Sequence, residues 1–294
     1  MVGSAAAVGS NHVSFSDLQA SELVVVTGAS SGIGRAAVQH LAGVGFHVLA
    51  GVRNDHDAAT VSSDQVEAVL LDITDEDQVA ALARRVESDP QARPLRAVVN
   101  NAGIAVAAPV EVIPLADWRR QFEANFFGHV AVIQALLPAL LSSRGRVINI
   151  SSIGGRVAGP TFGAYSASKF ALEAMSDALR REVRHLGVEV VVVEPGAIAT
   201  PIWEKGIVAA AAMQSATSEE QRRRYGKINA GALQRARDAA ATGVPPDQVA
   251  EVITKAITVP RPRTRYLVGR DAKITARLVA LLPDRVLDRM IGSR

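Results

Sequence analysis

The feature that most constrains the fold is a short apolar run that ends in a glycine loop. Residues 23–28 (LVVVTG) are mostly β-branched and apolar, and residues 32–44 carry apolar side chains at helical spacing. This order predicts a buried strand, a tight loop and a helix. Gly28, Gly32 and Gly34 stand in a G-x-x-x-G-x-G spacing where the loop enters the helix. A strand, glycine loop and helix in this order are typical of an α/β fold.

The same alternation continues along the chain. Short continuous apolar runs predict further buried strands, and stretches with helical spacing lie between them. The predicted strands are residues 46–52, 67–72, 96–100, 146–151 and 188–195, and the predicted helices include residues 75–88 and 163–185. Repeated alternation of this kind predicts a single-domain Rossmann fold, with a doubly wound parallel sheet of about seven strands and helices on both faces.

Changes in composition suggest where this domain begins and ends. Residues 1–20 contain small residues but neither a basic segment nor a sustained apolar one, which predicts a flexible tail rather than a signal peptide. Residues 21–270 show no repeat and no linker, so we expect one domain there. Between about 200 and 245 the sequence becomes rich in Ala and Arg, and an inserted helical lid is the simplest interpretation. Residues 271–294 form an amphipathic extension.

Composition also excludes several classes of protein and site. The chain has no cysteine, which excludes disulfides and thiolate metal ligands and favours a reducing, cytoplasmic setting; we predict no metal site. The formal net charge is only +3, so nucleic acid is not expected as a partner. The uncharged residues 124–143 have membrane-spanning length, but Asn125, His129 and Pro138 within them favour a buried core helix.

The glycine loop indicates a site for a dinucleotide. Glycines let the backbone approach a pyrophosphate, and the helix N-terminus offers free N–H groups and a favourable dipole, although an ordinary turn would show the same motif. Arg53 follows the second predicted strand, where an NAD enzyme places an acidic residue on the ribose 2′-hydroxyl. Arginine suits a 2′-phosphate, which favours NADP(H) over NAD(H). Asp55 or Asp57 could instead reach a ribose, so NAD(H) remains the alternative.

Tyr165 and Lys169 are four positions apart, which places both side chains on one face of a helix. A tyrosine with its ordinary pKa of about 10 is a poor base at neutral pH, whereas a nearby ammonium stabilises the phenolate. Such pairs are also common on solvated helices, so the surrounding motifs must decide between a structural and a catalytic role.

Those motifs resemble the short-chain dehydrogenase/reductase (SDR) family over residues 21–270. Ser152 precedes Tyr165 by 13 positions, the separation found in that family, which selects Ser152 over Ser151. The other motifs also follow the family's order: TGASSGIG at 27–34, NNAG at 100–103, YSASK at 165–169 and PGAIAT at 195–200. The resemblance implies a catalytic set of four residues: Asn125, Ser152, Tyr165 and Lys169.

The family's chemistry suggests what each of these residues does. Ser152 and Tyr165 would hydrogen-bond a substrate carbonyl, Tyr165 would donate the proton, and Lys169 would lower the pKa of Tyr165 and hold the nicotinamide ribose. Asn125 would hold a water that connects the lysine to solvent. The structural alternatives are a serine that ends a strand and a polar residue that satisfies a buried helix. Five motifs in register favour the catalytic interpretation.

The resemblance also implies the contacts of the cofactor. Asp72 resembles the aspartate that contacts adenine, Ile33 would lie along the nicotinamide, and Thr200 resembles the threonine that touches the carboxamide. The whole predicted set is Gly28, Ser30, Ser31, Gly32, Ile33, Gly34, Arg53, Asp72, Ile73, Asn101, Ala102, Gly103, Tyr165, Lys169, Pro195, Gly196, Ile198 and Thr200.

Residues 151–183 resemble the family members that act on steroids and retinoids, the hydroxysteroid and retinol dehydrogenase-like subset. We therefore expect an oxidoreductase that interconverts an alcohol and a ketone or aldehyde on an apolar, steroid-, retinoid- or lipid-like substrate. A non-catalytic NADP(H)-binding sensor or scaffold is one alternative, and an epimerase or a reductase of carbon–carbon double bonds is another. Apolar residues after Thr200 could cover the pocket or pack the lid: Ile202, Trp203, Ile207, Val208 and Met213.

Two surfaces suggest further contacts. The apolar helices at 115–142 and 163–186 resemble the pair through which family members associate, so a homodimer or homotetramer is expected. The basic amphipathic segment 271–294 is broken by Pro283. It could fold on its own domain, which we favour, cap a neighbouring subunit, or rest on a membrane surface.

Overall fold

The strands of the protein run side by side in the order β3-β2-β1-β4-β5-β6-β7, and every neighbouring pair is parallel. This computed structural model describes residues 22–215 and 217–292, so the predicted tail at 1–20 lies outside the described residues. The strands are β1 (Leu23–Val26), β2 (His47–Val52), β3 (Val66–Leu70), β4 (Leu95–Asn100), β5 (Arg146–Ile150), β6 (Glu189–Pro195) and β7 (Arg265–Val268). The predicted Rossmann fold with a seven-stranded parallel sheet is confirmed.

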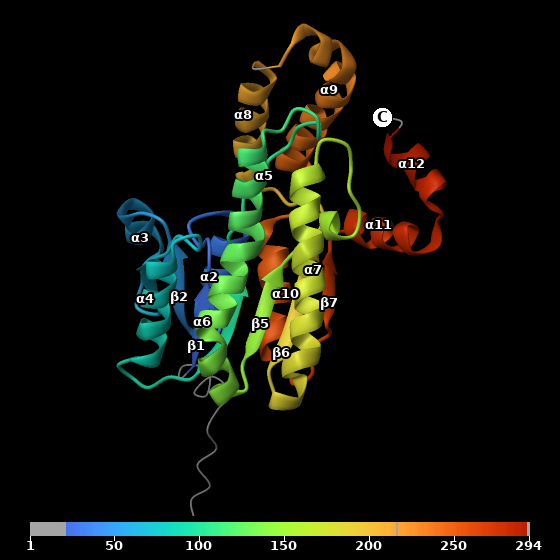
Figure 1. Cartoon of the computed structure of the whole chain (residues 1–294). Helices are drawn as coiled ribbons and strands as arrows, with labels where there is room; N and C mark the ends of the chain where they lie inside the picture. Colours follow the sequence, from blue (N-terminus) through green and yellow to red (C-terminus); the bar gives the residue numbers. More distant parts are fainter. Residues whose placement is uncertain (1–21, 216, 293–294) are drawn as a thin grey trace, which may run out of the picture.

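Helices cover both faces of this sheet (Figure 1). On one face, α2 and α10 pack together and against the strands, and α4, α6 and α7 cover the other face. The helices are α2 (Gly32–Gly43), α3 (Asp55–Val61), α4 (Glu76–Glu87), α5 (Leu115–Phe122), α6 (Gly128–Ser143), α7 (Gly163–Val183), α8 (Ile202–Ser215), α9 (Glu219–Thr242), α10 (Pro246–Thr258), α11 (Arg270–Leu281) and α12 (Asp284–Gly292), with short turns η1 (Glu123–Phe127), η2 (Ile153–Gly155) and η3 (Arg184–Leu186).

The packing of the core explains why the sequences of the strands are continuous apolar runs. Alternate side chains of β1 enter two different clusters, Val24 and Val26 with α2 and α10, and Leu23 and Val25 with α4, α6 and α7. A strand that is buried on both faces must be apolar at every position. Each fully buried aliphatic side chain contributes about 1.5–3 kcal/mol of transfer free energy, so this sheet is a rigid platform for the loops at its edge.

One continuous helical stretch, Leu115–Ser143, is long and apolar enough to cross a membrane by length and composition. It contains α5, the π-turn η1 and α6. Val132, Leu136 and Leu140 on its inner side are completely or almost completely buried in the core cluster beneath the sheet. This packing favours the core helix that the sequence predicts over a membrane span.

Residues between Thr200 and Pro245 form two helices, α8 and α9, which project together from the carboxyl edge of the sheet (Figure 1). A capping box starts α9, since the Ser218 hydroxyl accepts from the Gln221 N–H and the Gln221 side chain accepts from the Ser218 N–H. At the base of the pair, Val244 bridges to the segment around Ile198 through two backbone hydrogen bonds of 2.9 and 3.0 Å. The pair of helices is therefore a hairpin whose two ends meet.

The C-terminal segment forms α11 and α12, which are separated near Pro283. Ala272 and Ala276 bury one side of α11 against the domain, whereas no residue of α12 is buried. Leu281, between the two helices, is 80% exposed. The extension thus folds on its own domain along α11, and α12 lies apart from it.

Candidate active site

A cavity of about 560 Å³ opens at the carboxyl ends of the strands. Loops that follow β1, β2, β3, β4, β5 and β6 all contribute to its lining. In open parallel sheets, ligands bind at the carboxyl ends of the strands, where the strand order reverses. Every predicted site residue lines this cavity except Gly34. The structure therefore brings together side chains that lie more than a hundred residues apart in the sequence.

The glycine loop has the geometry that its sequence predicts. Gly28 and Gly32 have φ values of +65° and +55°, which favour glycine, and a Cβ on Gly28 would stand 2.8 Å from the Ala102 Cα. A Cβ on Gly34 would stand 2.2 Å from the Gly28 carbonyl oxygen, so Gly34 serves close packing behind the loop. Ser31, at the N-cap of α2, makes no side-chain cap bond, which leaves the first N–H groups of α2 for an anion.

Thr27 and Asn101 brace this loop against the NNAG segment. The buried Thr27 Oγ1 accepts hydrogen bonds of 3.0 Å from the backbone N–H groups of Asn101 and Ala102. In return, Asn101 Nδ2 donates to the carbonyl oxygens of Thr27 and Gly28 at 3.0 and 3.1 Å. Thr27 was absent from the predicted set, although it belongs to the TGASSGIG motif.

Arg53 follows β2 directly and lies exposed on the cavity wall. None of the ion pairs within residues 22–215 and 217–292 includes Arg53. Asp57 accepts a hydrogen bond of 3.0 Å from Asn54, the N-cap of α3, and neither Asp55 nor Asp57 lines the cavity. A cation rather than a carboxylate therefore faces the place where the second strand ends.

Tyr165 and Lys169 lie on the first turns of α7, with the Lys169 Nζ 6.0 Å from the centre of the Tyr165 ring. Lys169 is almost fully buried and donates a hydrogen bond of 2.8 Å to the Ile150 carbonyl oxygen at the end of β5. Ser152 follows the same strand, and its hydroxyl acts on the pKa of Tyr165. The Ser152 hydroxyl also accepts from the Gly154 N–H at 3.0 Å, which fixes its position.

Burial controls the electrostatics of this group. Desolvation lowers the pKa of Lys169 to about 8, and the nearby Glu173 carboxylate opposes that shift. Desolvation raises the pKa of Tyr165, and its hydrogen bond to Ser152 opposes that shift. Below about pH 8 the site therefore holds a protonated tyrosine beside a buried ammonium, an arrangement that can donate a proton and stabilise the phenolate that remains.

Asn125 lies within the π-turn between α5 and α6 and is fully buried. Its side chain accepts from the Ile104 N–H at 2.8 Å and donates to the Ile104 carbonyl oxygen at 3.0 Å, with a further 3.3 Å contact to the Ser168 hydroxyl. One turn earlier, Gln121 contacts the backbone of Ile104 and Val106 in the same way. These two amides hold the cavity wall, and the water proposed for Asn125 stays a prediction.

His129 is a buried neighbour of the site that the prediction left out of the active site. Its Nε2–H donates to the Ala102 carbonyl oxygen at 2.6 Å, while Nδ1 has no partner within the described part of the chain. Burial, with a smaller contribution from Lys169, lowers the pKa of His129 to about 3. The imidazole is therefore neutral, and its tautomer is set by the carbonyl.

Acid is expected to destabilise the protein through His129. The pKa of His129 in the folded protein lies below the ordinary 6.5, so the unfolded chain binds the proton more tightly. The free energy of unfolding therefore decreases as pH falls from about 6.5 towards 3. Between pH 7.5 and 5, wild type should lose about 2 kcal/mol more unfolding free energy than His129→Gln. Urea denaturation at both pH values measures this difference, and equal losses would contradict the assignment.

Comparison with known proteins shows the family. Residues 22–209 match a family model described as short chain dehydrogenase. The chain belongs to the short-chain dehydrogenase family. This confirms the resemblance that the sequence motifs indicate. It also agrees with the sheet order and with the position of the cavity.

Relatives of this family member share most of its length. A 3-amino-tetrahydro-pyrrolizinone reductase from Xenorhabdus hominickii is 40% identical over 255 residues, covering 85% of this chain and 87% of the reductase. An NADPH-dependent 3-dehydrocapnine reductase from Ornithobacterium rhinotracheale is 35% identical over 274 residues, covering 90% and 94%. Retinol dehydrogenase 5 from Homo sapiens is 36% identical over 282 residues, covering 91% and 87%, which confirms the resemblance to the retinol dehydrogenase-like subset.

A solved structure extends the comparison to three dimensions. A short chain dehydrogenase from Burkholderia cenocepacia in complex with NADP superposes with a TM-score of 0.73 at 26% identity, covering 93% of this chain and 98% of that one. The likeness to this solved structure therefore extends beyond the 22–209 match.

Asp271 is a residue near the site that sequence reasoning missed. It stands in the first turn of α11, and its carboxylate accepts from the Ala197 N–H at 2.7 Å. A Cβ on Gly196 would stand 2.1 Å from the same carboxylate, so the predicted cofactor loop packs directly on Asp271. The two partners are 74 residues apart, and no local pattern announces such a contact. The C-terminal extension thus supports the floor of the cavity.

Proposed function

We propose that this short-chain dehydrogenase is an NADP(H)-dependent oxidoreductase that interconverts an alcohol and a ketone or aldehyde on an apolar substrate. One observation carries the proposal: Ser152, Tyr165 and Lys169 line the same cavity as the glycine loop, with the Lys169 Nζ 6.0 Å from the centre of the Tyr165 ring. A binding protein without chemistry would need the loop but not the three convergent side chains.

The residues of the chain supply positioning and proton transfer. In the proposed reaction, the hydroxyls of Ser152 and Tyr165 donate hydrogen bonds to one substrate oxygen, where negative charge develops as the carbonyl is reduced. Tyr165 gives its proton to that oxygen, and the Lys169 ammonium stabilises the phenolate left behind. NADPH, when bound, supplies the hydride. Oxidation of the alcohol uses the same residues, with Tyr165 as the base.

The lining of the cavity supports the choice of cofactor. The open N-terminus of α2 and the close approach allowed by Gly28 and Gly32 suit a pyrophosphate, and Arg53 suits a 2′-phosphate. The reductase from Ornithobacterium is described as NADPH-dependent, and the Burkholderia structure holds NADP. NADP(H) is therefore the proposed cofactor, and NAD(H) is the alternative that binding tests must include.

Arg53→Ala is expected to weaken NADPH binding by about 10- to 100-fold, because a charge-assisted hydrogen bond to the 2′-phosphate contributes about 1.5–3 kcal/mol. NADH binding should change little, since that cofactor lacks the phosphate. Fluorescence titration of both nucleotides measures the two constants. Arg119→Ala, which removes an exposed arginine outside the cavity, is the matched control. An equal loss for both nucleotides would place Arg53 elsewhere than on the 2′-phosphate.

The substrate side of the cavity supports an apolar ligand. Trp203, from α8, packs edge-on against Phe162, and Phe162 packs in the same way against Tyr165, with ring centres 6.4 and 6.3 Å apart. Ile202 also lines the cavity, whereas Met213 packs on the cluster around Val106. Val208 is 71% exposed and Ile207 does not line the cavity. Ile202 and Trp203 therefore line the pocket, whereas Met213 packs on a cluster of residues outside the hairpin.

The experiment that tests the function is turnover with a panel of steroid, retinoid and aliphatic ketones, each with NADPH and with NADH. NADPH-dependent reduction of an apolar ketone is the expected result. Tight NADPH binding without turnover of any substrate would favour the sensor or scaffold, the second class of function. Failure to bind either nucleotide would overturn both.

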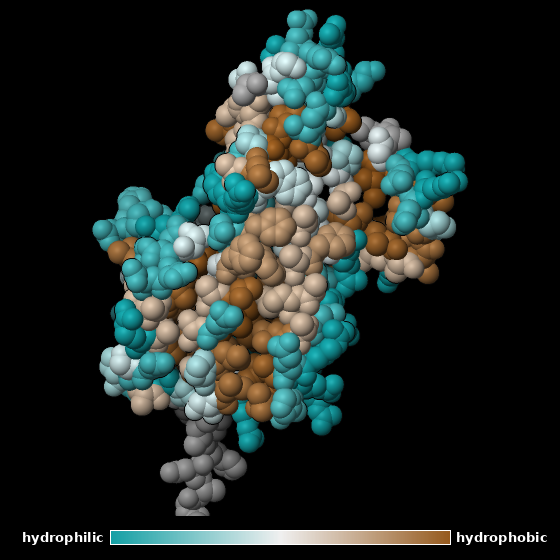
Figure 2. Space-filling view, viewed as in Figure 1, coloured by the Kyte–Doolittle hydropathy of each residue, from teal (hydrophilic) through white to brown (hydrophobic). Residues whose placement is uncertain are grey.

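Two further expectations belong to this proposal. The surface over α6 and α7 is largely hydrophobic (Figure 2). Phe127, the last residue of η1, and Phe170, on α7, are 52% and 44% exposed. We propose that the protein associates through this face as a homodimer or homotetramer. We also propose a cytoplasmic location, because the chain contains no cysteine and its longest apolar helix packs against the sheet.

A further inference from the structure

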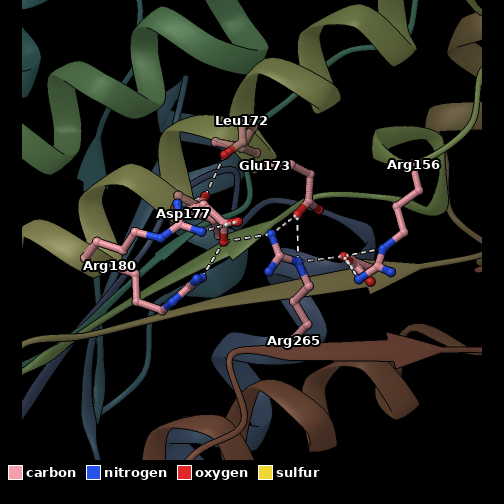
Figure 3. Close-up of polar contacts among 10 residues, drawn as sticks. Arg156, Leu172, Glu173, Asp177, Arg180 and Arg265 are labelled. Atoms are coloured by element: carbon pink, nitrogen blue, oxygen red, sulfur yellow. Dashed lines mark hydrogen bonds and ion pairs between the residues drawn. The ribbon is translucent and has the colours of Figure 1, made fainter. Parts of the chain in front are cut away.

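Five charged side chains contact one another beside α7, and three of them are partly exposed: Arg156 (33%), Asp177 (26%) and Arg265 (26%) (Figure 3). They come from four elements: Arg156 follows η2, Glu173 and Asp177 lie on α7, Glu194 on β6 and Arg265 on β7. Glu194 is fully buried and Glu173 is 8% exposed. Buried carboxylates are rare unless they are paired, so this group requires an explanation.

The contacts form one connected network. Arg156 approaches Glu194 Oε1 through both Nε and Nη2 at 2.8 Å. Arg265 Nε lies 3.3 Å from the same oxygen and 3.1 Å from Glu173 Oε2, and Arg265 Nη2 donates to Asp177 at 2.9 Å. Arg265 is therefore shared by three carboxylates, and Glu194 is shared by two guanidinium groups.

Three members of the network are close in sequence to residues that line the cavity. Arg156 lies four positions after Ser152, and Glu173 lies one helical turn after Lys169. Glu194 directly precedes Pro195, which lines the cavity. The network thus connects the loop that carries Ser152 (residues 151–157), helix α7 with Tyr165 and Lys169, and strand β6, which leads into the PGAIAT segment at 195–200.

Packing at Gly155 shows that the serine loop rests directly on α7. A Cβ at Gly155 would stand 3.0 Å from the Glu173 Cγ and 3.2 Å from the Lys169 carbonyl oxygen. Next to it, a Cβ at Gly154 would stand 3.2 Å from the Tyr165 ring. With so little space, the position of Ser152 relative to Tyr165 depends on how firmly this loop is held.

Stability alone does not account for such a network. Taking carboxylates out of water is costly, and apolar side chains of similar size commonly stabilise a fold as well as a buried ion pair does. What a multidentate network adds is a defined geometry, because each guanidinium fixes the direction of its partners. The geometry fixed here is that of the segments that carry Ser152, Tyr165 and Lys169.

We propose that Glu194 and Glu173, joined through Arg156 and Arg265, are positioning residues that hold the Ser152 loop in register with Tyr165. This inference rests on the proposed function, since it assigns the network to the reaction of that site. None of the five side chains lines the cavity. Its removal should displace the serine hydroxyl and leave the dinucleotide site intact.

Glu194→Gln tests the proposal, because it removes the charge and keeps the shape. The variant should lower kcat by about 10- to 100-fold, the effect of a misplacement of the order of 1 Å, with the dissociation constant for NADPH within about two-fold of wild type. Glu67→Gln is the matched control: Glu67 pairs with Arg85 and His47 at the opposite end of the sheet. That variant should leave kcat unchanged. An unchanged kcat in Glu194→Gln, or equal losses in kcat and NADPH affinity, would overturn the proposal.

Arg156→Ala gives a second route if the buried substitution prevents folding, because the Arg156 side chain is 33% exposed. Its kcat should fall similarly and recover in part when guanidinium ions are added at low, non-denaturing concentration. Loss of activity without any recovery would count against a positioning role for this guanidinium.

Hydrogen–deuterium exchange separates failure of this inference from failure of the proposed function. Amides of residues 151–157 should exchange faster in Glu194→Gln than in wild type, and those of β1 and β4 should be unchanged. This readout needs no turnover, so it tests the network even if no substrate is reduced. Unchanged exchange in residues 151–157 would show that the network does not hold the loop.

Discussion

Replacing Tyr165 with phenylalanine is expected to lower kcat by about 10²- to 10⁴-fold, the usual contribution of a positioned general acid. The ring and its edge-on contact with Phe162 remain, so the cavity keeps its shape. Binding of NADPH should therefore stay within about two-fold of wild type, because the loss is confined to proton transfer. Single-turnover kinetics with NADPH in excess would measure the chemical step directly.

Tyr266→Phe is the matched control for this variant. The Tyr266 hydroxyl accepts from the Arg263 N–H at 3.0 Å and does not line the cavity, so its loss should leave kcat unchanged. If Tyr165→Phe retains more than about a tenth of the wild-type kcat, another group must donate the proton. That outcome would remove the residue on which the proposed mechanism depends.

Replacing Lys169 with methionine is expected to damage catalysis and stabilise the fold at once. The apolar side chain cannot stabilise a phenolate, and it cannot hold a ribose hydroxyl, so both kcat and NADPH affinity should fall by at least about 10-fold. A loss confined to one of the two would contradict the double role of Lys169.

The stability change in Lys169→Met depends on pH. Burial lowers the pKa of Lys169 from 10.5 to about 8, so the unfolded chain binds this proton more tightly and the charged lysine destabilises the fold below about pH 8. The penalty disappears as pH rises towards 10.5. The variant should therefore be about 2–3 kcal/mol more stable than wild type at pH 7, and the difference should shrink at pH 10. Lys255→Met, on the exposed side of α10, is the control for denaturation at both pH values.

The sheet could be predicted from the sequence because its strands are buried on both faces. Such strands leave unbroken apolar runs, and six of the seven were located within one or two residues of their observed bounds. The seventh, Arg265–Val268, was expected but not located, because a four-residue strand that contains Arg265 and Tyr266 carries no such run. Its place at the edge of the sheet relaxes the need for apolar side chains.

The cavity was predictable for a different reason. Its lining comes from loops that directly follow strands. The glycines and the pair of Tyr165 and Lys169 belong to short sequence motifs that are tied to a particular backbone geometry. The π-turn around Asn125 escaped prediction, because its side chain is satisfied by the backbone of Ile104, 21 residues earlier. The ion network escaped for the same reason, since Arg156 and Glu194 meet only once the sheet has formed. Contacts of this kind form between distant parts of the chain and produce no periodic pattern in the local sequence.

The closed base of the α8 and α9 hairpin has a consequence for how this enzyme scaffold can evolve. Because Val244 pairs with the segment around Ile198, the chain leaves and re-enters the domain at almost one point. Insertions whose ends already meet add little to the entropy of loop closure, so hairpins of other lengths and sequences can be exchanged there. Substrate range can therefore diversify through one replaceable module, while the frame that holds the reacting groups is inherited unchanged.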